Sequence, residues 1–256
     1  MKRFALLALL LAAGQAPAAG PVPRGAPDCP APAADREPRA RDLVVLVHGM
    51  GRTPLSMAPL ARHLERAGYR VRNVGYSSYG PDVASIGRRV ARETRAALAE
   101  APAGRVHFVT HSLGGVVVRW VLAHERPERV GRVVMLAPPN QGAAIADRMS
   151  PWLGWLLRPM RELRTDPSGI VRRLPPAPGV PVLVIAGDDD GKVSPEEAHL
   201  DGAEAELVVD SGHTFIMLRP SVMRVVAAYL AGEVPAGAAC PHGPSLPARA
   251  AGPATP

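Results

Sequence analysis

A serine at the junction of an apolar run and a glycine-containing turn is the strongest candidate for chemistry. Residues 106–117 read VHFVTHSLGGVV, which predicts a buried strand, a sharp turn at Ser112 and then a helix. Such a turn needs small neighbours because the two backbones nearly touch, and Gly114 supplies one. Thr110 stands where the G-x-S-x-G pattern has glycine, so we expect crowding there. The context favours a nucleophilic Ser112 over a merely structural serine.

A serine hydroxyl needs a base within hydrogen-bond reach, normally a histidine that a carboxylate orients. Of the eight histidines, His213 lies in a small-residue loop directly after the last predicted strand. The penultimate predicted strand is followed by Asp188, Asp189 and Asp190, and spacing alone does not choose among them. A serine, an acid and a histidine that each follow a separate strand have the chain order of a triad on a parallel sheet.

The oxyanion that forms when a hydroxyl attacks a carbonyl needs backbone N–H donors placed in advance. Leu113 follows Ser112 at a helix start, and residues 45–51, VLVHGMG, end the first predicted strand in a glycine-rich loop. This loop could supply a second donor. The alternative is a tight strand-to-helix connection that needs glycine only for its backbone conformation.

The elements that must position these residues alternate along the chain, which predicts a mostly parallel sheet of about six strands with helices on both faces. Several runs are continuous in Val, Leu and Ile, as expected for strands buried on both faces. The predicted strands are 43–47, 70–74, 106–110, 132–136, 182–186 and 206–209. The predicted helices are 54–67, 82–99, 113–124, 194–199 and 221–231.

One long connection, residues 141–180, interrupts this alternation. It carries two of the three tryptophans, Trp152 and Trp155, among leucines, methionines, arginines and prolines. Its length and apolar content favour a cap over an apolar pocket. The alternative is an ordinary surface helix that packs its Trp and Leu side chains onto the sheet.

The ends of the chain predict export. Residues 1–18 combine a cationic start, an apolar run and an Ala-Pro-Ala cleavage signal, the pattern of a secretory signal peptide. Pro- and Ala-rich tails at 19–41 and 233–256 then flank a catalytic domain at 42–232. We therefore expect a periplasmic or secreted protein, in which Cys29 and Cys240 form a disulfide across the tails or remain two free thiols.

The charge argues against one class of partner. The net charge is +7, but the arginines are scattered along the chain and do not form a stripe with aromatic residues. This pattern gives no nucleic-acid footprint, although it allows loose attraction to anionic surfaces. No stretch after the leader approaches the length of a membrane span.

From residue 43 to residue 230 the chain resembles bacterial serine esterases and lipases of the α/β-hydrolase superfamily. The resemblance rests on the stretches LVVLVHGMG, HFVTHSLGGVVVRW, VVMLAPPNQG, DDGKVS and SGHTFIM. It implies that Asp190, directly before a Gly-x-Val turn, is the triad acid. It also implies that Met50, after His-Gly, and Leu113 donate the oxyanion N–H groups.

The resemblance implies hydrolysis of a small-molecule or lipid ester by Ser112, His213 and Asp190, with no cofactor, no metal and no obligate protein partner, and with transient lipid-surface contact. Two alternatives stay open. One is acyl transfer to an acceptor other than water by the same triad. The other is a catalytically silent fold that binds a lipid or a protein through the apolar insertion.

Overall fold

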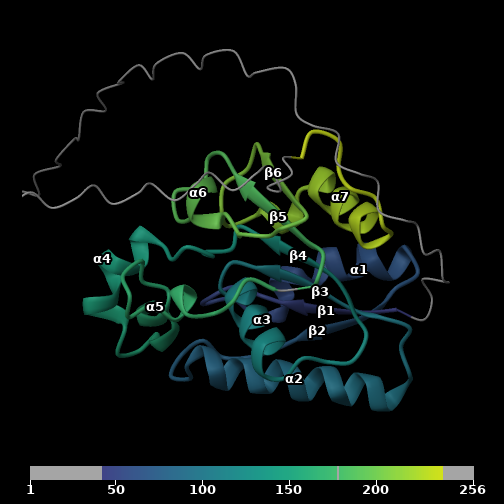
Figure 1. The fold of residues 1–256 in the computed structure, drawn as a ribbon, viewed down its shortest axis with the longest axis horizontal. Coiled ribbons are helices and arrows are strands. Elements are labelled where there is room, and N and C mark those ends of the chain that lie inside the picture. Colours follow the sequence, from purple (N-terminus) through teal and green to yellow (C-terminus); the bar gives the residue numbers. More distant parts are fainter. Residues whose placement is uncertain (1–41, 178, 239–256) are drawn as a thin grey trace, which may run out of the picture.

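The described residues form a single parallel β-sheet. A computed structural model describes residues 42–177 and 179–238. Its six strands lie in the order β2-β1-β3-β4-β5-β6, and every neighbouring pair is parallel (Figure 1). The strands are β1 (Leu43–Val47), β2 (Arg70–Val74), β3 (Val106–His111), β4 (Val130–Leu136), β5 (Val182–Gly187) and β6 (Ala205–Val209).

Helices cover both faces of this sheet (Figure 1). They are α1 (Ala58–Arg66), α2 (Val83–Glu100), α3 (Leu113–His124), α4 (Ala144–Leu153), α5 (Arg158–Glu162), α6 (Pro195–Ala198) and α7 (Pro220–Leu230). Three short 3-10 helices complete the described elements: η2 (Pro54–Met57), η3 (Ile170–Arg172) and η4 (Ile216–Leu218). The predicted fold class is therefore confirmed.

Two hydrophobic cores sandwich the sheet because side chains alternate along each strand. Val45 packs into the core under α2 and α3, whereas its neighbours Val44 and Leu46 pack into the core under α1 and α7. All five residues of β1 are fully buried. This explains why the strand is apolar at every position and not at alternate positions.

The predicted elements hold to within one or two residues, with one exception. The predicted helix 54–67 is divided, since Pro54 opens the 3-10 turn η2 and the α-helix begins only at Ala58. Proline lacks the N–H that would continue an earlier helical turn, and Pro59 falls in the first turn of α1. The helix ends before Gly68, which has a φ of +93°.

The strand order places the site. β1 pairs with β2 on one side and with β3 on the other. The chain therefore moves toward one edge of the sheet from β1 to β2, and toward the opposite edge from β3 to β6. In open parallel sheets, functional residues gather at the carboxyl ends of the strands near such a switch point. The turns after β1, β3, β5 and β6 carry the residues singled out by the sequence.

The predicted signal peptide, the whole tail at 19–41, most of the tail at 233–256, Cys29 and Cys240 lie outside the described residues. Within residues 42–177 and 179–238, no helix has both the length and the apolar character needed to cross a bilayer.

Candidate active site

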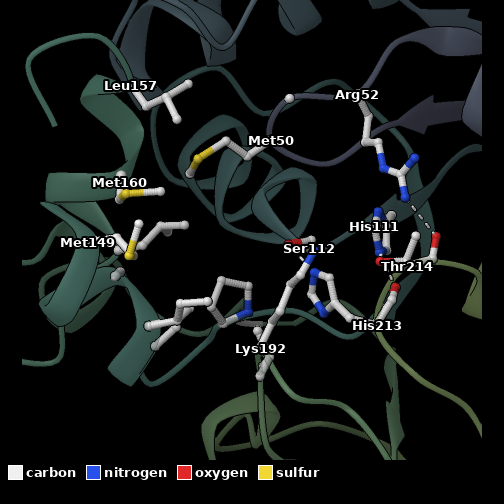
Figure 2. Close-up of a pocket in the computed structure, with 17 residues that line it drawn as sticks. Met50, Arg52, His111, Ser112, Met149, Leu157, Met160, Lys192, His213 and Thr214 are labelled. Carbon is white, nitrogen blue, oxygen red and sulfur yellow. Dashed lines mark hydrogen bonds between the residues drawn. The ribbon is translucent and has the colours of Figure 1, made fainter. Parts of the chain in front are cut away.

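Ser112 occupies a strained turn of one residue between β3 and α3. Its backbone has a φ of 52° and a ψ of −122°, a conformation that L-residues rarely adopt. The Ser112 N–H donates to the Leu136 carbonyl at 2.8 Å, which ties the turn to the end of β4. The Ser112 side chain lines a pocket above this edge of the sheet (Figure 2).

Glycines let two backbones approach Ser112. A Cβ on Gly114 would lie 2.4 Å from the Val47 carbonyl oxygen, so the start of α3 rests directly on the end of β1. A Cβ on Gly49 would lie 2.8 Å from His111 Nδ1 and 3.2 Å from Ser112 Cβ. Gly49, in the loop after β1, and Gly114, in the turn after β3, therefore allow this loop to pack directly against the turn that holds Ser112.

The crowding expected at Thr110 is relieved by a neighbouring glycine. Thr110 is fully buried, and its hydroxyl donates to the Val134 carbonyl at 3.3 Å. Gly115 faces it, since a Cβ there would lie 3.5 Å from Thr110 Oγ1 and 2.9 Å from Pro138 Cβ. The departure from the G-x-S-x-G pattern is thus accommodated by a small residue five positions later.

Ser112, His213 and Asp190 form a continuous hydrogen-bonded chain. His213 Nε2 lies 3.0 Å from Ser112 Oγ, and His213 Nδ1 lies 2.8 Å from Asp190 Oδ2. Because an ionised carboxylate only accepts hydrogen bonds, the Nδ1 atom carries the proton and Nε2 is left to accept from the serine hydroxyl. The sequence-predicted serine, histidine and acid therefore meet, although they lie on three separate loops.

Of the three adjacent acids, the structure puts Asp190 against the histidine. Its Oδ1 atom accepts from the backbone N–H groups of Lys192 and Val193, each at 2.9 Å. Burial by itself would raise the pKa of Asp190, but the bonds from His213 and from these two N–H groups outweigh it and hold the pKa below its usual range. Asp188 accepts instead from the Ser211 N–H, and Asp189 is exposed.

Two residues that the sequence analysis did not single out hold the histidine loop. The buried His111 donates from Nε2 to the His213 carbonyl at 2.9 Å. Arg52 donates to the Thr214 carbonyl at 3.1 Å. The position of His111 directly before Ser112 could have indicated its role from the sequence. The role of Arg52 could not be found in this way, because its partner Thr214 is 162 positions away along the chain.

His111 acts as a neutral donor. Burial, and then the repulsion from His213, lowers the pKa of His111 to about 3. Since a carbonyl can only accept, Nε2 carries the single proton of this ring. The other ring nitrogen, Nδ1, is buried and has no hydrogen-bond partner among the residues that the structure describes.

The loop with Met50 is fixed beside Ser112. The Gly51 N–H donates to Ser78 Oγ at 2.7 Å, and the Tyr76 hydroxyl donates to the His48 carbonyl. The His48 and Tyr76 rings stack with centroids 4.0 Å apart. Met50 lines the same pocket as Ser112, and Leu113 is the first residue of α3, where a helix leaves its N–H groups without intrahelical partners.

The pocket over Ser112 has a volume of about 300 Å³. On one side α4, α5 and the residues around them supply an apolar wall (Figure 2). This wall comprises Ala143, Ile145, Ala146, Met149, Leu157, Met160 and Leu163. On the other side of Ser112 lie Arg52 and Thr214, and Lys192 extends toward Ser112 beside His213.

The insertion thus covers an apolar pocket, as the cap hypothesis expects. The alternative interpretation, in which its tryptophans pack onto the sheet, is wrong, because Trp152 is 75% and Trp155 is 70% exposed. Among the described residues, no group of three or more His, Cys, Asp or Glu side chains is arranged to hold a metal ion.

Comparisons with known proteins agree with this architecture. Residues 42–168 match the family model of the alpha/beta hydrolase fold. The mature form of the Bacillus licheniformis lipase BlEst2 superposes with a TM-score of 0.64 at 20% identity, over 78% of this chain and 96% of that chain. No curated protein sequence matches significantly.

Two further solved structures share the fold at similarly low identity. One is a metagenome-derived lipolytic enzyme of the LipS and LipT study, with a TM-score of 0.57, 17% identity and coverage of 74% of this chain and 93% of that one. The other is a monoacylglycerol lipase of Paleococcus ferrophilus, with a TM-score of 0.52, 18% identity and the same two coverages, 74% and 93%. The parallel sheet, the strained serine turn and the matching family model together show that this chain has the α/β-hydrolase fold.

Proposed function

We propose that this protein is a serine hydrolase that cleaves carboxylic esters. The observation that carries the proposal is the hydrogen-bonded chain from Ser112 through His213 to Asp190, at 3.0 and 2.8 Å. The strained turn presents the hydroxyl at the pocket, and the acid is ionised and buried. These are the requirements of nucleophilic catalysis by a serine.

The mechanism follows from the atoms that each group offers. His213 Nε2 takes the hydroxyl proton as Ser112 Oγ attacks the ester carbonyl, and Asp190 stabilises the imidazolium that results. The N–H groups of Met50 and Leu113 bind the developing oxyanion, a contribution of roughly 3 to 4 kcal/mol for one donor. His213 then protonates the departing alkoxide, and water hydrolyses the acyl-enzyme by the same proton route in reverse.

The pocket supports an ester with an aliphatic acyl group. Its wall on the side of α4 and α5 is apolar, and an alkyl chain there would be removed from water. Trp152 and Trp155 are exposed on the insertion that forms this wall, which supports the proposal of transient contact with a lipid surface. Adding phosphatidylcholine vesicles should then shift tryptophan emission to the blue; no shift would count against that contact.

Replacing the nucleophile tests the function directly. Ser112→Ala should lower kcat for a p-nitrophenyl acyl ester by at least about 10³-fold, because the serine, histidine and acid act as one unit. Ser221→Ala, an exposed serine on α7, is the matched control and should hydrolyse the ester at the wild-type rate. Turnover by Ser112→Ala at the wild-type rate would refute the assignment.

A fluorophosphonate probe separates the hydrolase from a silent fold. An activated serine reacts with it covalently, so the wild type should be labelled at Ser112 and the Ser112→Ala variant should not. Product analysis with added alcohols then distinguishes hydrolysis from acyl transfer. We expect the free acid as the product, whereas an acylated alcohol as the main product would favour a transferase.

A further inference from the structure

The pocket is electrically one-sided. Among the 17 described residues that line it, Arg52 and Lys192 are cationic and none is an aspartate or glutamate. Arg52 lies on the far side of Ser112 from the apolar wall, and Lys192 extends toward Ser112 beside His213 (Figure 2). A substrate that fills the pocket therefore meets an apolar wall beneath the insertion and two cations beside Ser112 and His213.

Arg52 is a positioned cation with spare donors. It is half-buried, it donates one hydrogen bond to the Thr214 carbonyl at 3.1 Å, and its guanidinium lies 5.9 Å from the centre of the Phe215 ring. A guanidinium has five N–H groups. Within the described part of the chain, Arg52 forms no ion pair with a carboxylate. Its remaining N–H groups and its charge are available to a ligand.

Lys192 stands out by its residue type and by its attachment. The sequence holds 30 lysines and arginines, and only Lys2 and Lys192 are lysines. The backbone N–H of Lys192 donates to Asp190, so the turn that positions the acid also positions this side chain. The side chain is exposed and extends toward Ser112 beside His213 (Figure 2). No carboxylate in the described residues pairs with its ammonium group.

The reaction assigns the cationic side to the alcohol half of the ester. His213 must protonate the departing alkoxide, so the alcohol half lies next to the imidazole. Both cationic residues are hydrogen-bonded to residues next to this histidine. Arg52 donates to the carbonyl of Thr214, and the backbone N–H of Lys192 donates to Asp190, which pairs with the imidazole. The acyl half is then left for the apolar wall beneath the insertion.

We propose that Arg52 and Lys192 form a subsite for an anionic group, a phosphate or a carboxylate, carried by the alcohol half of an ester whose acyl half is apolar. This inference rests on the proposed function and specifies its substrate class. An anionic group there would interact with both cations and with no competing acid of the pocket lining. The two ion pairs, one with Arg52 and one with Lys192, would both be partly solvated. Together they should give an anionic ester a kcat/KM about tenfold above that of a neutral one.

Two matched pairs of monomeric esters test the preference. One pair is 1-octanoylglycerol 3-phosphate against 1-octanoylglycerol, and the other is 4-(octanoyloxy)benzoate against its methyl ester. The wild type should show a kcat/KM for the anionic member about tenfold above that for the neutral member in at least one pair. A preference in one pair only identifies the anion as phosphate or as carboxylate. High salt should shrink the preference, since these charges are partly exposed.

Variants assign the preference to the two side chains. Lys192→Met should lower the ratio of anionic to neutral kcat/KM several-fold, while Lys192→Arg should retain it. Arg52→Gln should lower the ratio in the same direction. The matched control is Arg224→Gln, which removes an exposed charge from α7 and should leave the ratio unchanged. The Lys192 variants give an answer even if Arg52→Gln fails to fold, because the Lys192 side chain is exposed.

Equal kcat/KM values within both pairs of esters would overturn the subsite. So would a preference that persists undiminished in Lys192→Met and Arg52→Gln. These outcomes differ from a failure of the proposed function, in which neither the charged nor the neutral esters would be hydrolysed.

Discussion

The carboxyl edge of the sheet and the insertion that covers it are built in different ways. At the edge, buried strands end in short turns, and side chains from three loops are joined by hydrogen bonds of 2.8 to 3.0 Å. The insertion consists of short helices and exposes Trp152 and Trp155. It is tied to the rest by contacts such as the Glu162 carboxylate, which accepts from the Val83 N–H at 2.7 Å. In the proposed function, the edge carries out the chemistry and the insertion shapes the space around the substrate.

If Ser112, His213 and Asp190 act as one unit, removing the charge of Asp190 should lower kcat more than the other changes considered below. Asp190→Asn keeps the shape but offers an amide N–H to His213, which favours the wrong tautomer of the imidazole. We expect kcat for a p-nitrophenyl ester to fall by roughly 10³ to 10⁴-fold. Asp189→Asn, an exposed neighbour, is the control and should retain wild-type kcat. Similar losses in both variants would contradict the assignment of the acid.

The support of the histidine loop should have the next largest effect. His111→Leu removes the donor to the His213 carbonyl, and we expect kcat to fall about 10- to 100-fold with a smaller change in KM, because small displacements of a catalytic group are costly. His111→Gln offers an amide donor in place of the imidazole and should recover part of the loss. Steady-state kinetics of the two variants decide the question, since a purely space-filling role would give no advantage to glutamine over leucine.

The same residue should make the edge sensitive to acid. The pKa of His111 is about 3 in the folded protein and about 6.5 in an unfolded chain, so below pH 6.5 the unfolded state binds the additional proton. The stability from a neutral His111 is complete above pH 6.5 and declines as the pH falls toward 3. The loss amounts to about 2 kcal/mol at pH 5.

Urea unfolding at pH 7 and pH 5 measures this loss. The free energy of unfolding of His111→Gln should fall less between the two pH values than that of the wild type, because glutamine does not titrate. Equal falls in the two proteins would show that His111 does not contribute to the acid sensitivity.

The contrast between the two regions also explains what the sequence could predict. Strand ends follow from local apolar runs, so Ser112 and His213 could be found from the turns that contain them. Asp190 could not be chosen from spacing, because the choice depends on which side chain the turn directs inward and which backbone N–H groups it meets. The role of Arg52 depends on a contact with a loop 162 residues away. The exposure of Trp152 and Trp155 depends on which face of the insertion covers the pocket, and composition does not reveal it.

The insertion should affect selectivity and leave the chemistry of the edge in place. Met160 on α5 lines the apolar wall, and Met160→Trp would fill part of the space for an acyl chain. We expect the ratio of kcat/KM for octanoyl over acetyl p-nitrophenyl esters to fall about tenfold, within the range that apolar pockets achieve for small differences in chain size. Trp152→Ala is the matched control on α4, because this side chain is 75% exposed and does not line the pocket. It should change the ratio less than about twofold, since a side chain that already faces water contributes little burial to a bound acyl chain. An unchanged ratio in Met160→Trp, or an equal change in both variants, would mean that the insertion does not set the chain-length preference through the wall that Met160 lines.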